Sequence, residues 1–210
     1  MQRAYYFYFQ YSPIIPLVYG FYHFRSLSQP LKILLYWLSF SLSLTISMTI
    51  LAKQGQNNLW LMNISLPVYT FLLLWMFSLW EQRSSAKLAL KIFIAVFVCI
   101  WLMETTIGNS LFTFTIYSRP IMDVMIVAVG CFAIYEDSRT TESLLVERPR
   151  FWISSGLILY YGGTLFVNLL SRQLLQISNT AMQKALLIQP GLSLFSHLLY
   201  TIGLRCQCRK

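Results

Sequence analysis

The sequence predicts an all-α protein, a polytopic transmembrane bundle of seven helices that forms one domain over residues 1–210. Three observations lead there: 57% of the residues are hydrophobic and only 11% are charged, apolar stretches of about the length of a membrane crossing recur along the chain, and the basic residues between them alternate in density. A soluble domain has about 25% charged residues. This composition therefore excludes a soluble globule with a polar surface.

Seven apolar segments are each long enough, or nearly so, to cross the roughly 30 Å of bilayer hydrocarbon as a helix of about 20 residues. The expected spans are residues 4–24, 32–52, 58–80, 88–107, 119–136, 151–171 and 184–204. The first is rich in Tyr and interrupted by Pro13 and Pro16. An interfacial hairpin or an uncleaved entry segment is the alternative for that segment.

The basic residues predict the orientation, because short loops rich in Lys and Arg stay in the cytoplasm. Eleven of the 16 fall in alternate intervals, and five fall on the other side. The eleven are Arg25, Lys32, Arg83, Lys87, Lys91, Arg139, Arg148, Arg150, Arg205, Arg209 and Lys210. We therefore expect a multi-pass protein of the cytoplasmic (inner) membrane, with its N-terminus outside and its C-terminus in the cytoplasm. The net charge of +9 then reflects this rule and anionic lipid headgroups rather than nucleic-acid binding.

Segment 32–52 contains SFSLSLTISMT, in which hydroxyl residues alternate with apolar ones from Ser39 to Thr49. Alternation is typical of a barrel strand, but barrel strands need only about 9–11 residues, and this apolar run is twice as long. On a helix, we expect the hydroxyls to bond back to the preceding turn or to permit close packing. A hydrophilic conduit is the alternative.

Polar side chains at membrane depth are costly to bury and usually face the bundle interior, a partner or water. The predicted topology places five of them at similar depth in the outer half of five different segments. These candidate ligand-binding residues are Asn63, Glu104, Asp123, Asn168 and Gln189. They predict an outward-facing polar cavity, whereas the alternative for each is snorkelling or a hydrogen bond between helices. His197 lies deeper and is either a proton-sensitive switch or a neutral histidine paired with a Ser or Tyr.

Glycines predict close helix packing in segment 151–171, where Gly156, Gly162 and Gly163 give small faces. Metal and cofactor sites are not expected, since the chain has only two histidines. Neither HExxH nor GxSxG occurs, which favours a non-enzymatic protein. Cys206 and Cys208 lie in the predicted cytosolic tail, and whether they are acylated is left open.

The runs NNLWLMNISLPVYTFLLL at 57–74 and ERPRFWISSGLILYYGGTLFVNLL at 147–170 are similar to the third and sixth segments of small bacterial seven-helix inner-membrane proteins of uncharacterised function. The resemblance implies a role in membrane sensing or a signalling partnership. It also implies a carboxylate near Tyr69, which this chain lacks.

These observations favour a sensor or receptor-like module that binds a ligand from the outer side and acts through a cytosolic or membrane signalling partner. A small-solute carrier or permease is one alternative, and a structural subunit of a membrane complex is another. A retinal protein is disfavoured, because the last segment carries only Lys184, at its edge. The sequence leaves the oligomeric state open.

Overall fold

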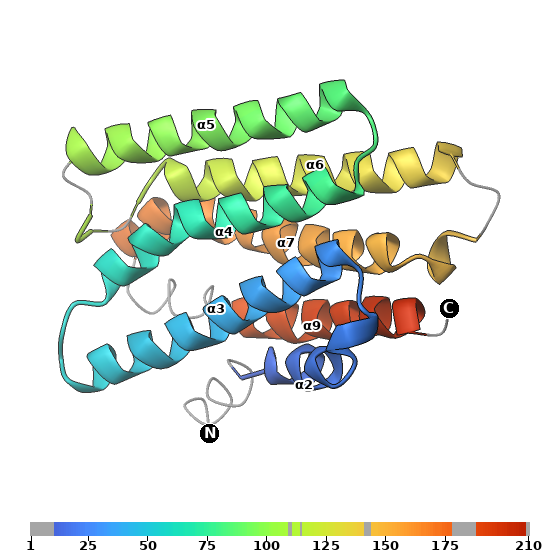
Figure 1. Cartoon of the computed structure of the whole chain (residues 1–210). Coiled ribbons are helices and arrows are strands. Elements are labelled where there is room, and N and C mark those ends of the chain that lie inside the picture. Colours follow the sequence, from blue (N-terminus) through green and yellow to red (C-terminus); the bar gives the residue numbers. More distant parts are fainter. Residues whose placement is uncertain (1–10, 109–110, 114, 141–143, 178–187, 209–210) are drawn as a thin grey trace.

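The computed structural model describes residues 11–108, 111–113, 115–140, 144–177 and 188–208. This part of the chain forms seven α-helices and two short 3-10 helices with no strand, so the all-α prediction is confirmed. The α-helices are α2 (Ile14–Tyr22), α3 (Gln29–Lys53), α4 (Leu59–Trp80), α5 (Ser84–Thr106), α6 (Ser118–Thr140), α7 (Pro149–Ile177) and α9 (Ile188–Cys208) (Figure 1). The 3-10 helices are η1 (Phe24–Ser26) and η2 (Leu145–Glu147).

Four of the described helices, α3 to α6, are long and apolar enough to cross a membrane, which indicates a membrane protein. They correspond to the segments predicted at 32–52, 58–80, 88–107 and 119–136. The first predicted span is represented by α2, whose nine residues extend only about 14 Å. Residues 4–10 of that segment lie outside the described residues.

Six helices close a ring, and α5 lies outside it. Going round the ring, α2 packs on α3, α3 on α4, α4 on α6, α6 on α7, α7 on α9, and α9 on α2 again. Helix α5 contacts α4 and α6 and forms one edge of the bundle (Figure 1). Leu88, Ile92 and Val96 of α5 are exposed, as expected for side chains that face lipid.

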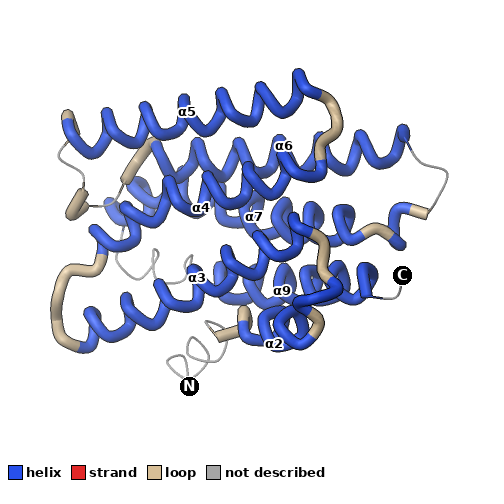
Figure 2. Tube along the Cα trace, viewed as in Figure 1, coloured by secondary structure: helices blue, strands red, loops and turns tan. Residues whose placement is uncertain are grey.

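Successive α-helices alternate in direction (Figure 2). One end of the bundle carries residues 23–28 and 81–83, η2 and the end of α9; we call it the basic end, since Arg25, Arg83, Arg148 and Arg205 lie there. The other end, here called the opposite end, carries residues 54–58 and 115–117. The half of the ring nearer the basic end is filled by apolar side chains that are at most 2% exposed. This aliphatic layer includes Leu31, Leu34, Leu35, Leu38, Leu73, Leu74, Ile153, Leu157 and Leu204.

Prolines and glycines fit these helices in different ways. Pro30, Pro149 and Pro190 lie in the first turns of α3, α7 and α9, where a missing N–H costs little. The packing predicted for Gly156 is confirmed, since a Cβ there would lie 2.5 Å from the Tyr200 ring of α9. Gly163 likewise meets α9, at Leu192, whereas at Gly162 the nearest atom, on Val127, would be 3.8 Å away.

Candidate functional site

A cavity of about 590 Å³ lies between α3, α4, α7 and α9, within the ring. Its volume is in the range of about 300–1,000 Å³ that small-molecule sites occupy. It lies in the half of the bundle nearer the opposite end, because α3 contributes its second half and α9 its first. The cavity is lined by Pro13, Trp37, Ser41, Thr45, Met48, Thr49, Ala52, Asn58, Tyr69, Tyr160, Tyr161, Gln189, Pro190, Ser193, Ser196, His197 and Tyr200.

Aromatic rings form the inner limit of this cavity, next to the aliphatic layer. Trp37 is edge-on to Tyr69 of α4 and to Tyr200 of α9, with both centroid distances 6.1 Å. Tyr160 and Tyr161 of α7 add a further pair at 5.2 Å. Edge-to-face packing at such distances stabilises aromatic clusters, so the two contacts of Trp37 join α3 to α4 and to α9 at mid-length. We call Trp37, Tyr69, Tyr160, Tyr161 and Tyr200 the aromatic floor.

A stripe of hydroxyls on α3 leads from the floor toward the opposite end. Ser41, Thr45 and Thr49 recur every four residues, so they share one face of the helix, and all three line the cavity. Thr45 donates to the Ser41 carbonyl at 2.9 Å and Thr49 to the Thr45 carbonyl at 2.7 Å. Ser39, Ser43 and Ser47 bond back in the same way. The predicted back-bonding is therefore confirmed, and the two threonine oxygens on the cavity face keep lone pairs that can accept hydrogen bonds.

Two lining side chains have buried polar atoms without a protein hydrogen-bond partner. They are the indole Nε1 of Trp37, a residue that is 5% exposed, and the Oγ of Ser196, a residue that is 1% exposed. Leaving a buried donor unpaired costs about 1–3 kcal/mol. Neither atom has accessible surface, so both lie within the wall and are not presented to the cavity.

His197 links α9 to the chain ahead of α2. Its Nδ1 lies 2.8 Å from the Ser12 hydroxyl and 3.3 Å from that of Ser193. Its ring also packs edge-on against Tyr200 at 5.6 Å. The structure thus places the predicted switch residue at the cavity, with two serine partners, and Gln189 lies on the same wall.

Asp123 and Asn168 lie together but do not line the cavity. The Asn168 amide donates to the Asp123 carboxylate at 2.5 Å, and both side chains are buried. Arg119, one turn before Asp123 on α6, interacts electrostatically with Asp123 and with Tyr69 and Tyr160 of the aromatic floor. A buried polar cluster therefore borders the cavity through the tyrosines.

Asn63 and Glu104 hold the connection between α5 and α6 and are not among the cavity's lining residues. Asn63 donates to the carbonyls of Leu111 at 2.8 Å and Thr113 at 2.7 Å. Glu104 accepts the backbone N–H groups of Ile116, Tyr117 and Ser118, as well as the Ser118 hydroxyl. The carboxylate thus satisfies amides at the start of α6, a favourable place for negative charge. The five residues predicted to share one site are therefore distributed over three locations.

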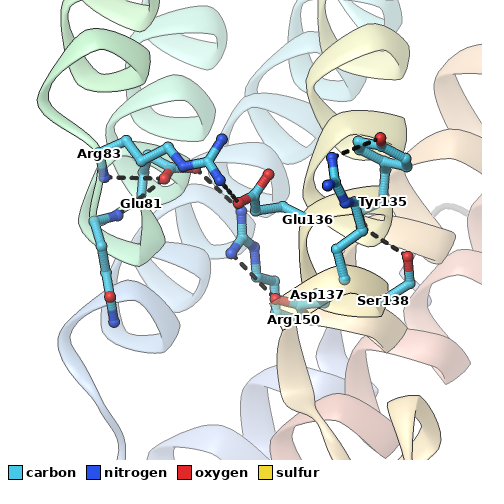
Figure 3. Close-up of polar contacts among 9 residues, drawn as sticks. Glu81, Arg83, Tyr135, Glu136, Asp137, Ser138 and Arg150 are labelled. Carbon is cyan, nitrogen blue, oxygen red and sulfur yellow. Dashed lines mark hydrogen bonds and ion pairs between the residues drawn. The ribbon is translucent and has the colours of Figure 1, made fainter. Parts of the chain in front are cut away.

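A network of ion pairs joins α4, α6 and α7 at the basic end (Figure 3). Arg150 of α7 lies 3.2 Å from Asp137 and 3.6 Å from Glu81, and these three side chains are at most 14% exposed. Arg148 adds a second contact to Asp137 at 3.4 Å, and Arg83 pairs with Glu136 at 2.9 Å. A second cavity of about 610 Å³ adjoins this network.

Sequence reasoning missed both the network and the aromatic floor. The available signal for the network was the position of Glu81, Glu136 and Asp137, three acids next to the most basic intervals of the chain. The available signal for the cavity was the four-residue spacing of Ser41, Thr45 and Thr49. Within the described residues, no group of three or more His, Cys, Asp or Glu side chains could hold a metal ion. Comparisons with protein-family models, with curated proteins and with solved structures found no match for this chain.

Proposed function

We propose that this protein is a non-enzymatic membrane sensor, in which the cavity binds a small molecule from the outer side and the basic end passes the change to a membrane or cytosolic partner. The proposal includes seven membrane crossings, with the basic end in the cytoplasm of the cell and the opposite end outside. The distribution of Lys and Arg supports this orientation. The observation that carries the function is the cavity itself, with its hydroxyl stripe and aromatic floor.

Two helices give a route from the cavity to the basic end. Helix α4 supplies Tyr69 to the floor and leads into Glu81 of the ion network. Helix α7 supplies Tyr160 and Tyr161 to the floor and Arg150 to the same network. A ligand that moves α7 relative to α4 would therefore alter the distance between Arg150 and Glu81. Packed helices with two discrete arrangements are the usual carriers of such coupling.

The test is binding to the purified protein in nanodiscs, followed by its effect on the basic end. A compound library is screened for saturable thermal stabilisation of the wild type, of Thr45→Trp, which fills the cavity, and of Ser47→Trp, which places the same ring on the exposed face of α3. We expect the response to be lost in Thr45→Trp and kept in Ser47→Trp. Equal responses in all three proteins would contradict binding in this cavity.

The effect on the basic end is measured with spin labels at Gln82 and Leu144, two exposed positions, in a background without native cysteines. A sensor predicts that a hit from the screen changes the distance distribution between the labels. If the distance distribution between the labels stays unchanged while the compound saturates the cavity, the proposed coupling between the cavity and the basic end is contradicted.

A carrier is the second candidate, and the cavity at the basic end favours it. The aliphatic layer argues for the sensor, because ten or so fully packed apolar side chains separate the two cavities and would have to part during each transport cycle. Flux of a bound compound into proteoliposomes distinguishes the two. A sensor binds the compound without net uptake, whereas a carrier accumulates it.

A further inference from the structure

We propose that the second cavity, at the basic end, is an anion site that binds a phosphate group through Arg83, Arg148 and Arg150. The phosphate belongs to a lipid headgroup or to a soluble phosphate compound, and the two share the chemistry that this cavity recognises. The proposed site is independent of the ligand of the first cavity, because the two cavities have no lining residue in common.

The cavity of about 610 Å³ lies at the basic end of four ring helices. Its lining comes from the end of α4 and the connection after it, the end of α6, the start of α7 and the end of α9. The lining residues are Trp80, Glu81, Gln82, Arg83, Glu136, Asp137, Arg148, Pro149, Arg150 and Gln207. Three arginines and three acids therefore meet at one cavity, and their relative exposure decides which charge a ligand meets.

In every ion pair of this network, the arginine is the more exposed partner. The Arg83 side chain is 62% exposed, whereas that of its partner Glu136 is 10% exposed (Figure 3). Arg148 is 27% exposed against 5% for Asp137, and Arg150, at 14%, is more exposed than both of its acidic partners. The acids are therefore largely covered, and most of the accessible charged surface at this cavity is guanidinium.

A guanidinium carries five N–H donors in a planar fork, and one carboxylate occupies at most two of them. An exposed arginine can therefore bind an anion while its ion pair stays intact. Arg83 approaches the cavity from the connection between α4 and α5, and Arg148 and Arg150 approach it from the start of α7. A carboxylate has two oxygens in one plane, which one guanidinium satisfies. The oxygens of a phosphate point in several directions, so they can meet guanidiniums from both elements.

The rest of the lining suits the same ligand. Gln82 and Gln207 carry side-chain amides that can donate to phosphate oxygens. Trp80 and Pro149 add apolar surface, and the volume lies in the range of small-molecule sites. The cavity therefore has room for an organic group attached to the phosphate.

The experiment compares matched probes on the full-length protein in dodecyl maltoside, a detergent without phosphate. In the soluble arm, isothermal titration compares inorganic phosphate and glycerol 3-phosphate with acetate at equal ionic strength. In the lipid arm, native mass spectrometry compares dioleoylphosphatidic acid with dioleoylglycerol, which differ by the phosphate group. We expect phosphate to bind about tenfold more tightly than its matched partner in at least one arm, as one charge-assisted hydrogen bond allows. The arm that responds identifies the source of the phosphate.

Three variants assign the binding to this cavity. Arg83→Gln should weaken phosphate binding about tenfold, and the double variant Arg83→Gln/Glu136→Gln, which removes both charges of the pair, should also bind more weakly than the wild type. Glu136→Gln alone should tighten binding about two- to fivefold, because it removes a negative charge that competes with the phosphate. A purely structural ion pair predicts no such gain.

Arg139→Gln is the matched control for the charge of the basic end. Arg139 is exposed on α6 and is not a lining residue of the cavity, so its loss should change phosphate affinity by less than about twofold. Phosphate probes that bind no better than their partners in both arms would overturn the site. Equal losses in Arg139→Gln and Arg83→Gln, or no gain in Glu136→Gln, would also overturn it, and none of these results bears on the first cavity.

Discussion

Asn168 on α7 donates its side-chain amide to the carboxylate of Asp123 on α6 over 2.5 Å. Asp123 is 1% exposed and Asn168 is 7% exposed, so water does not replace this contact when it is lost. The bond joins two ring helices beside the aromatic floor. It makes Asn168 a supporting residue of the cavity rather than part of its surface.

Replacing Asn168 by Leu should destabilise the protein by about 2 kcal/mol, because the buried carboxylate loses a hydrogen bond. The expected fall in melting temperature is about 4–8 °C for a chain of this length. The exchange Asp123→Asn with Asn168→Asp restores an amide–carboxylate pair and should recover part of the loss. An unchanged melting temperature in Asn168→Leu would show that this bond contributes nothing to stability.

Glu104→Gln should loosen the start of α6 without weakening ligand binding. The neutral amide cannot accept the N–H groups of Ile116, Tyr117 and Ser118 as well as a carboxylate does, and the expected cost is about 1–2 kcal/mol. Hydrogen exchange at these three amides should accelerate. Glu147→Gln, at an exposed position, is the control and should change neither exchange nor stability.

Asp137→Asn should be strongly destabilising, by about 3 kcal/mol, because Arg148 and Arg150 lose a buried counter-charge. Arg139→Ala, two residues further along α6, is the matched control. Arg139 is exposed and bonds the Tyr135 hydroxyl at 3.1 Å, so its loss should change stability by less than about 1 kcal/mol. Thermal unfolding of both variants in nanodiscs makes the comparison, and similar losses would argue against a structural role for the buried pairs.

Gly156 and Gly162, two glycines of α7, should show opposite changes in stability when each is replaced by alanine. At Gly156 the new Cβ would be 2.5 Å from the Tyr200 ring, so Gly156→Ala should cost about 1–3 kcal/mol and weaken ligand binding in the cavity by displacing the ring from the aromatic floor. At Gly162 there is room, and alanine should stabilise the helix by up to about 1 kcal/mol. A Gly156→Ala variant as stable as the wild type would contradict the α7–α9 packing.

Cysteine accessibility in cells tests the orientation. In a background without native cysteines, Gln56→Cys at the opposite end should react with a membrane-impermeant maleimide, whereas Arg139→Cys at the basic end should react only after permeabilisation. Both positions are exposed, so access to reagent depends on the side of the membrane. The reverse pattern would contradict the orientation inferred from Lys and Arg.

The sequence was sufficient for the helices whose apolar length alone defines them. Segments 32–52, 58–80 and 88–107 each agree with an observed helix within a few residues, because bilayer thickness fixes the length of a crossing. The described part of segment 4–24 is a short helix instead, since its prolines and aromatic residues give no uniform apolar run.

The candidate site was less predictable than the helices. The sequence gives the depth of a residue along a helix, but it does not give the rotation of the helix about its axis, which decides what the side chain faces. Asn63, Glu104 and Gln189 share a depth, yet the first two face the α5–α6 connection and the third faces the cavity. Trp37 and Ser196 carried no signal of their own, since a tryptophan and a serine in an apolar helix are equally consistent with packing. Their position on the cavity lining depends on a partner helix that is more than one hundred residues away in the chain.

The contact of α2 with α9 that closes the ring has a consequence for biogenesis. Helix α9 supplies one wall of the cavity and the histidine that binds Ser12, and it emerges from the ribosome after every other helix described above. On the proposed topology, α2, α3 and α7 therefore enter the membrane before the helix that covers their polar groups.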